Sequence, residues 1–337
     1  MSRFEELRPA AVNMLSSNLN LQPGERVGFV VDVASPVDWV QYPYARLEAV
    51  VQRSLMAKRI FEMMVEEFPD NRFGLICYPL TGQSGKEPPD ETAQQMLNYD
   101  VLVMMNTYSL SHTNAREHAS RQGIRVASMP GVDAAMFAPD GPMAADYQTI
   151  ARETREWAEM LTQTCQVRIA TPFGTDLSFS LAGRNGDADT GLLHHKGEFG
   201  NLPGGEAFIA PLEGTAVGKL VVPAGWHPDL KETMTFVFEN GYVGEVIGGG
   251  EVGDYYRELF AFGDEAKKHR RNCAELGIGT NPNARRPDNV LEAEKIRGTV
   301  HVAVGDNAHM GGMNESDLHE DFVLTQPSVW MDGKKVL

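Results

Sequence analysis

ELGIGTNP (275–282), GTVHVAVGDNAHMGG (298–312) and SDLHEDFVL (316–324) are the three most informative stretches of this chain. Two of them are typical of strands, because TVHVAV is rich in β-branched residues and FVL extends an alternating run. His319 and Asp321 are two residues apart, which on a strand places both side chains on one face. His301 is a polar ring in the middle of an apolar strand, where a bound ligand would explain it. A lone histidine on a strand is more often an ordinary core or surface residue. The combination of His301, His319 and Asp321 with Glu275, in a glycine-rich turn, is what indicates a zinc, manganese or iron site.

Composition limits the possible classes of protein. The chain has 337 residues, 42% hydrophobic and 23% charged, which predicts a globular protein with two domains. It has no continuous apolar run long enough for a membrane span, and its N-terminus lacks an apolar signal core, so we expect a cytoplasmic protein. The net charge is −16, from 30 basic and 46 acidic residues, which argues against a nucleic-acid-binding surface. The three cysteines have no CxxC spacing, and we expect each to be a small buried hydrophobe.

Strands and helices alternate in the N-terminal part. Four strands are expected over 26–32, 72–79, 100–107 and 124–130, with helices over 44–68, 90–97 and 112–122 between them. This order predicts an α/β domain with a parallel sheet over 1–140. A connecting helix is expected over 141–165. The remainder, 166–337, is predicted to be a β-rich α+β domain that carries the metal site, with an Asn-Gly hairpin in FENGYV (238–243) and a helix over 252–274.

Five motifs in order, GTDLSFSLAGR (174–184), LPGGEAFIAP (202–211), ELGIGTNP, GTVHVAVGDN and HEDFVL, resemble the M29 family of metallo-aminopeptidases, the aminopeptidase T and aminopeptidase S group. The resemblance covers about 170–335 and makes this chain a short, leucyl aminopeptidase-like variant of the thermophilic metalloprotease fold. It implies a homodimer with two divalent ions, zinc, cobalt or manganese, in the C-terminal domain. Carried over motif by motif, the implied metal ligands are Glu206, Glu275, His301, His319 and Asp321.

Two features keep alternatives open. The family has a tyrosine ligand where this chain has Ala308, with His309 beside it. A relative of the same fold, the 2,5-dihydroxypyridine dioxygenase, holds one iron with two histidines and an aspartate; it has histidine at the Glu275 position and lacks the Glu206 carboxylate. The carboxylate-rich set of this chain therefore favours the two-metal hydrolases.

The expected function is accordingly an aminopeptidase-like hydrolase that removes N-terminal residues from a peptide or small amide with a metal-activated water. Glu275 is expected to be a ligand or the general base. The alternatives are a single-iron, Fe(II)-dependent ring-cleaving dioxygenase or lyase, and a non-catalytic dimeric relative. Four residues are candidates for substrate contact, of which the first lies in a loop after a strand end, where open α/β sheets place ligands: His112, Asp306, Asn307 and His309.

Overall fold

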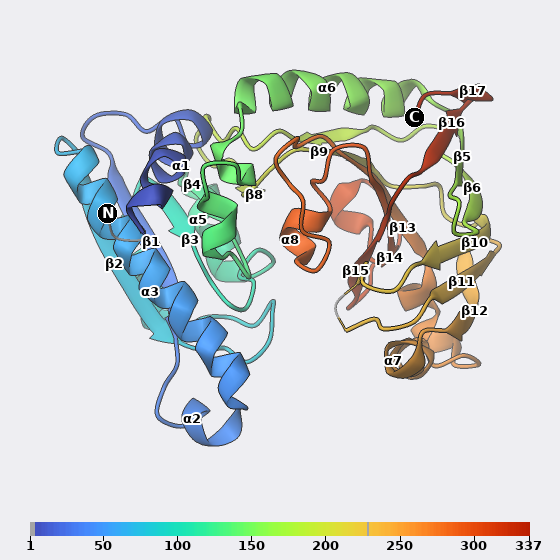
Figure 1. Ribbon diagram of the computed structural model, residues 1–337, viewed down its shortest axis with the longest axis horizontal. Coiled ribbons are helices and arrows are strands. Elements are labelled where there is room, and N and C mark those ends of the chain that lie inside the picture. The colour runs from blue at the N-terminus through green and yellow to red at the C-terminus, as the bar shows by residue number, and fades with distance from the viewer. Residues whose placement is uncertain (1–3, 228) are drawn as a thin grey trace. The chain divides into compact units, whose positions relative to one another are not determined.

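The computed structural model describes residues 4–227 and 229–337, which form two compact units (Figure 1). The first unit runs to Tyr147 and also includes Gly191–Gly204, whereas the second comprises Gln148–Thr190 and Gly205–Leu337. Helix α6 (Tyr147–Gln163), expected as a connector over 141–165, therefore belongs to the second unit from Gln148 onward. The excursion at Gly191–Gly204 returns to the first unit because its short strand extends the sheet there.

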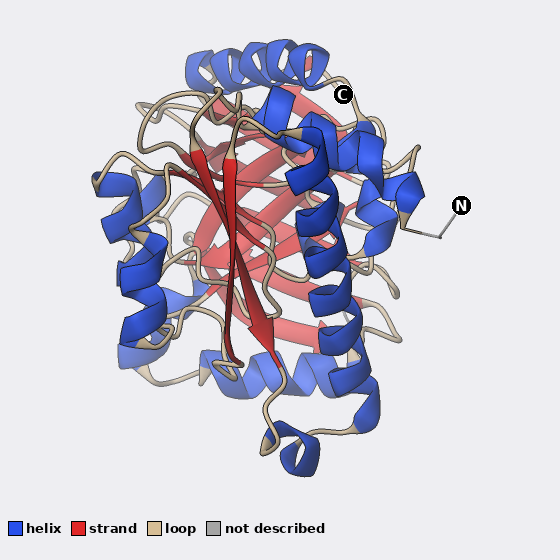
Figure 2. Ribbon diagram, turned by 90° about the vertical axis from the view of Figure 1, so that its left-hand side faces the viewer, coloured by secondary structure: helices blue, strands red, loops and turns tan. Residues whose placement is uncertain are grey.

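The first unit is built on a five-stranded parallel sheet in the order β2-β1-β3-β4-β8, which confirms the predicted fold class. Its helices lie on both sides of the sheet (Figure 2). Tyr78, Met96 and Leu102 belong to a buried cluster between strands and helices, as expected for a parallel sheet covered by crossovers. The elements are η1 (Glu5–Leu7), α1 (Arg8–Asn13), η2 (Met14–Asn18), β1 (Arg26–Val33), α2 (Asp38–Gln41), α3 (Tyr44–Glu67), β2 (Arg72–Pro79), α4 (Asp90–Met96), β3 (Val101–Met104), α5 (Asn114–Arg121), β4 (Arg125–Ser128), η3 (Ala134–Phe137), η4 (Pro142–Ala144) and β8 (Phe199–Asn201).

The second unit contains two antiparallel sheets. One has seven strands in the order β12-β11-β10-β6-β5-β16-β17, namely β5 (Gln166–Ala170), β6 (Asp176–Ser180), β10 (Val217–Val222), β11 (Met234–Glu239), β12 (Tyr242–Gly248), β16 (Ser328–Met331) and β17 (Lys334–Lys335). The other has five strands in the order β15-β14-β13-β9-β7, namely β7 (Asp187–Asp189), β9 (Glu206–Ile209), β13 (Cys273–Gly279), β14 (Val300–Gly305) and β15 (His319–Leu324). Apolar residues from both sheets form one buried cluster, so the main core of this unit lies between them.

Short helical elements complete the second unit: α7 (Gly250–Phe260), η5 (Glu265–Arg271), α8 (Val290–Ala293) and η6 (Ala308–Met310). The hairpin between β11 and β12 turns at Asn240 and Gly241, both with positive φ, as predicted. The helix expected over 252–274 is interrupted after Phe260, because Ala261 adopts a left-handed conformation with φ of 42°.

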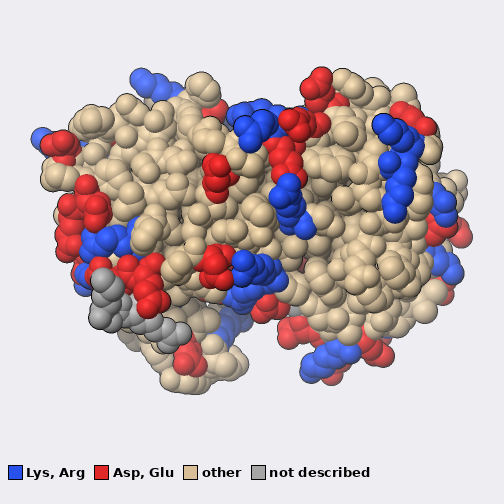
Figure 3. Space-filling view, turned by 45° about the horizontal axis from the view of Figure 1, so that its top comes forward, with Lys and Arg blue, Asp and Glu red and all other residues tan. Residues whose placement is uncertain are grey.

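Two surface properties bear on function. Among the described residues, every helix is too short or too polar to cross a membrane. On the face of the described chain drawn in Figure 3, basic side chains are interleaved with acidic ones. This face therefore lacks the continuous basic stripe that phosphate backbones require.

Candidate metal centre

The predicted ligands project from one face of the five-stranded sheet. Side chains alternate between the two faces of a strand. In each strand the residues of the opposite alternation belong to the core between the sheets: Ala207, Leu276, Ile278, Val300, Val302, Phe322 and Leu324. Glu206, Glu275, His301, His319 and Asp321 therefore share the opposite face.

Strand register and small residues bring these side chains together. Ala303 pairs with Glu275 on one side and with Asp321 on the other, so a single methyl group separates the two acidic residues. Gly277 pairs with His301, and a Cβ added at Gly277 would lie 1.9 Å from His301 Nε2. Glycine at this position is what allows the imidazole to lie over β13.

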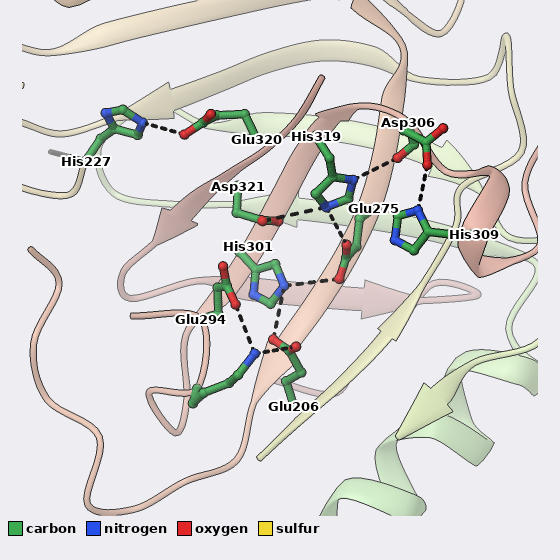
Figure 4. A network of polar contacts seen from close by, with 11 residues as sticks. Glu206, His227, Glu275, Glu294, His301, Asp306, His309, His319, Glu320 and Asp321 are labelled. Carbon is green, nitrogen blue, oxygen red and sulfur yellow. Dashed lines mark hydrogen bonds and ion pairs between the residues drawn. The ribbon is translucent and has the colours of Figure 1, made fainter. Parts of the chain in front are cut away.

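The ligating atoms converge closely (Figure 4). One ligand atom from each of Glu275, His301 and Asp321 lies within 4.8 Å of the others. His301 Nε2 is 3.3 Å from Glu275 Oε1, and His319 Nε2 is 3.1 Å from Glu275 Oε2 and 3.6 Å from Asp321 Oδ2. Glu275 thus faces both histidines and lies at the middle of the cluster.

The donor set fits a divalent cation. Among the described residues, the Asp321 carboxylate oxygen Oδ1 is buried and has no hydrogen-bond partner. Unpartnered buried acceptors are costly unless a cation satisfies them. Two imidazoles with two carboxylates suit zinc, manganese or iron(II), and two histidines with one carboxylate are typical of non-haem iron.

Mutual interaction shifts the pKa values of the cluster. Burial alone would raise the pKa of Glu275, but hydrogen bonds from His301 and His319 outweigh it and hold this pKa well below its usual value. Burial would lower the pKa of His301, but Glu275 and the nearby acids raise it to about 9. Asp321 raises the pKa of His319 in the same way, against the effect of burial. Glu275 therefore lies between two imidazoles, the position of a ligand shared with both, while the alternative role of general base stays a prediction.

A loop after β14 orients His319. The backbone carbonyl of Asp306 lies 2.8 Å from His319 Nδ1, which directs Nε2 of that ring towards the cluster. The Asp306 carboxylate lies 2.6 Å from Nδ1 of His309, whose ring centroid is 5.3 Å from that of His319. Asn307 is buried and bonded to Glu213 and Asn314, so its side chain holds the loop together.

The predicted site residues therefore fall into two groups. Those of the β-rich part come together in the second unit, whereas His112 is an exposed residue of the first unit, between β3 and α5. Ala308, at the position of the family tyrosine, is exposed at the start of η6.

Sequence reasoning missed a buried lysine in the cluster. The run between ELGIGTNP and GTVHVAVG is rich in charged residues, yet Lys295 within it is fully buried. Its ammonium lies 2.5 Å from Glu206 Oε1, 2.9 Å from Glu294 Oε2 and 3.9 Å from Asp189 Oδ2. Burial would lower the pKa of Lys295, but the surrounding carboxylates raise it well above its usual value, whereas burial raises the pKa of Glu294 to about 8. The segment VLEAEKIRG offered no signal for this, because its charges follow the pattern of a solvated surface helix.

Comparisons with known proteins identify relatives along the whole chain. A model of the family described as "NicX: 2,5-dihydroxypyridine 5,6-dioxygenase" matches residues 12–337. The 2,5-dihydroxypyridine dioxygenase from Pseudomonas putida KT2440 superposes with a TM-score of 0.73 at 16% identity, over 100% of this chain and 96% of that one. Wild-type AmpT from Thermus thermophilus superposes with a TM-score of 0.59 at 17% identity, over 99% of each chain. No curated protein matches in sequence.

These findings correct the predicted activity. The fold of the M29 group is shared, as the likeness to AmpT shows, and the expected two-unit fold class is confirmed. The expectation of an aminopeptidase acting on peptides or amides is wrong, because the family model that spans the chain is that of a dioxygenase. The expectation of a zinc hydrolase is overturned with it, and the dioxygenase alternative is the better supported of the two.

Proposed function

The chain belongs to the NicX family, and on this premise we propose that it is an iron(II)-dependent dioxygenase that opens a hydroxylated aromatic ring. The observation that carries this proposal is the convergence of two imidazoles and two carboxylates from adjacent strands on one point. Within this set, His301, His319 and Asp321 make up the two histidines and one carboxylate that are typical of iron(II) sites with open positions for small ligands. An electron-rich ring and O₂ together supply all the electrons of the reaction, so no external reductant is required.

Four side chains of this chain would hold the ion: Glu275, His301, His319 and Asp321. Bound iron would allow electrons to pass from the ring to O₂. The chain itself supplies rigidity, because the ligands stand on paired strands and their neighbours are fixed in the core. Glu275 takes the position at which the dioxygenase resemblance implied a histidine, so this centre carries one more negative charge, which favours a cationic or neutral ring over an anionic one.

Proton transfer is assigned to the Asp306–His309 pair. The hydrogen bond to Asp306 Oδ2 places the proton of neutral His309 on Nδ1, so Nε2 is the nitrogen that accepts a proton. The pair lies beside the candidate ligand His319, because the ring centroids of His309 and His319 are 5.3 Å apart. His309 would thus take the hydroxyl proton and return it to the opened product.

Oxygen consumption tests this function directly. The full chain is loaded anaerobically with Fe²⁺ and mixed with an air-saturated solution of 2,5-dihydroxypyridine, hydroquinone or 3-hydroxypyridine. In a separate assay, an aminoacyl anilide tests for hydrolase activity. We expect one O₂ consumed per ring opened, and a loss of at least about 100-fold in Asp321→Asn, because one ligand is weakened. Glu320→Gln is the matched control, since Glu320 lies on the same strand and contacts His227 instead. An iron-loaded protein that opens none of these rings, or that cleaves the anilide, contradicts the proposal.

A further inference from the structure

Lys295 is a permanent cation inside the cluster of acids. Its side chain has no exposed surface, and its ammonium contacts carboxylates of Glu206 and Glu294 directly, with Asp189 3.9 Å away. An ammonium group is buried at this depth only where opposite charges and hydrogen bonds compensate for lost hydration. Three carboxylates around one positive charge form the kind of environment that a metal ion also requires.

Glu206 marks the boundary between this ammonium and the proposed ion site. Its Oε1 is bonded to Lys295, whereas its Oε2 lies 3.5 Å from His301 Nε2. The ammonium of Lys295 and the imidazole of the candidate ligand His301 therefore lie on opposite oxygens of one carboxylate, the arrangement in which a carboxylate can bridge two cation positions. A second divalent ion held by Glu206 would be repelled by the adjacent ammonium.

The backbone fixes Lys295 in this position. Its carbonyl accepts a hydrogen bond from the Asn281 amide, and its own amide donates to the Glu292 carbonyl. The segment also packs directly on β13, because a Cβ added at Gly279 would lie 2.1 Å from the Ile296 carbonyl oxygen. The lysine is thus held beside the acids by main-chain contacts as well as by charge.

We propose that the ammonium of Lys295 occupies the place of a second metal ion and so restricts the centre to one divalent ion per chain. Glu206 then neutralises the lysine and is not required to bind the metal. This inference rests on the proposed function only in assuming that Glu275, His301, His319 and Asp321 hold one ion. It assigns the metal count, which the sequence motifs implied to be two, to a single residue outside those motifs.

Metal counting tests the assignment without reference to turnover. The full chain, freed of metal with chelator and dialysed, is titrated with Mn²⁺ by calorimetry, and bound manganese is counted by elemental analysis. We expect one ion per chain for the wild type and for Lys295→Arg, which retains a cation. Lys295→Met removes the charge at similar length, and we expect it to bind two ions per chain.

A second variant keeps the test decisive if Lys295→Met fails to fold. Glu206→Gln leaves Lys295 paired with Glu294, and we expect it to bind one Mn²⁺ with a Kd within about threefold of the wild type, since a change below 1 kcal/mol is typical of a residue that does not ligate the ion. Two ions in the wild type, one ion in folded Lys295→Met, or loss of manganese in Glu206→Gln would overturn the inference while leaving a metal-dependent enzyme in place. A wild type that binds no manganese and no iron would instead remove the proposed function itself.

Discussion

Gly277→Ala should displace the proposed metal ligand His301 while leaving the histidine itself unchanged. Gly277 lies across from His301 in the sheet, and a Cβ there would stand 1.9 Å from the ring nitrogen Nε2. Ordinary van der Waals contact begins at 3.4 Å, so the ring must move by 3.4 − 1.9 = 1.5 Å. The backbone at Gly277 has no positive φ, so alanine is compatible with the strand itself.

The size of the effect follows from the length of a metal–imidazole bond. That bond is about 2.1 Å long, and a shift comparable to the bond length takes the nitrogen out of coordination. Loss of an orienting partner alone typically weakens metal binding 10- to 100-fold, so loss of the ligand should raise the Kd for Mn²⁺ by at least about 100-fold, or about 2.7 kcal/mol. The folding cost should stay in the range of about 1–3 kcal/mol typical of an added methyl group in a packed site.

Calorimetric titration with Mn²⁺, combined with thermal unfolding of the metal-free protein, measures both quantities. Gly244→Ala is the matched control, because its added Cβ would meet nothing closer than 3.9 Å. We expect the control to bind manganese like the wild type. If Gly277→Ala binds Mn²⁺ with wild-type affinity, His301 does not ligate the ion in the position described, and the proposed ligand set fails.

Three further predictions address proton transfer, the thiols and the metal. His309→Ala should lower kcat about 100-fold, the typical contribution of a general base, and should leave the iron content unchanged. The control His195→Ala, at a highly exposed histidine, should change neither kcat nor iron content. If His309→Ala loses iron together with activity, His309 is a metal ligand and not the general base. Cys273 should not react with a thiol reagent at pH 9, because burial disfavours the thiolate and raises the pKa of this thiol to about 12. The exposed Cys77 and Cys165 should both react at pH 9. Three fast-reacting thiols in the native protein would contradict this prediction. Mn²⁺ at 100 times its Kd should stabilise the metal-free protein by about 2.7 kcal/mol in denaturant titrations, and Asp321→Asn should lose this gain at the same Mn²⁺ concentration.

Local pattern was sufficient for much of the fold. The alternation of β-branched and polar residues around His301 and at His319–Asp321 predicts strands with these side chains on one face, and the structure places them so. The Asn240–Gly241 turn was equally readable, because both residues tolerate positive φ. Cys77 and Cys165 were expected to be buried and are exposed, since a cysteine's own chemistry does not fix its depth in the fold.

Long-range arrangement was not readable in the same way. The strand at Phe199–Asn201 is three residues long, and only its parallel pairing with β4 reveals that the chain returns to the first sheet. The helix expected over 252–274 ends early because one non-glycine residue, Ala261, adopts a left-handed conformation. Neither the pairing partner of a short strand nor a left-handed alanine follows from local residue preference.

The proposed role of Lys295 explains why the motifs alone implied two metal ions. Carboxylates and imidazoles that converge on strands can hold one ion or two, and the motifs that contain them are the same in either case. We propose that the charge placed against the shared carboxylate decides between them; here an ammonium is bonded to Glu206 from a segment that contributes none of the motifs. In the sequence, a lysine in a charged run looks the same whether it is buried or exposed. Lys295 is buried because its backbone hydrogen bonds to Asn281 and Glu292 fold the connection between β13 and β14 back onto the sheet. Under this proposal the number of metal ions depends on tertiary charge compensation, which ligand motifs alone do not contain.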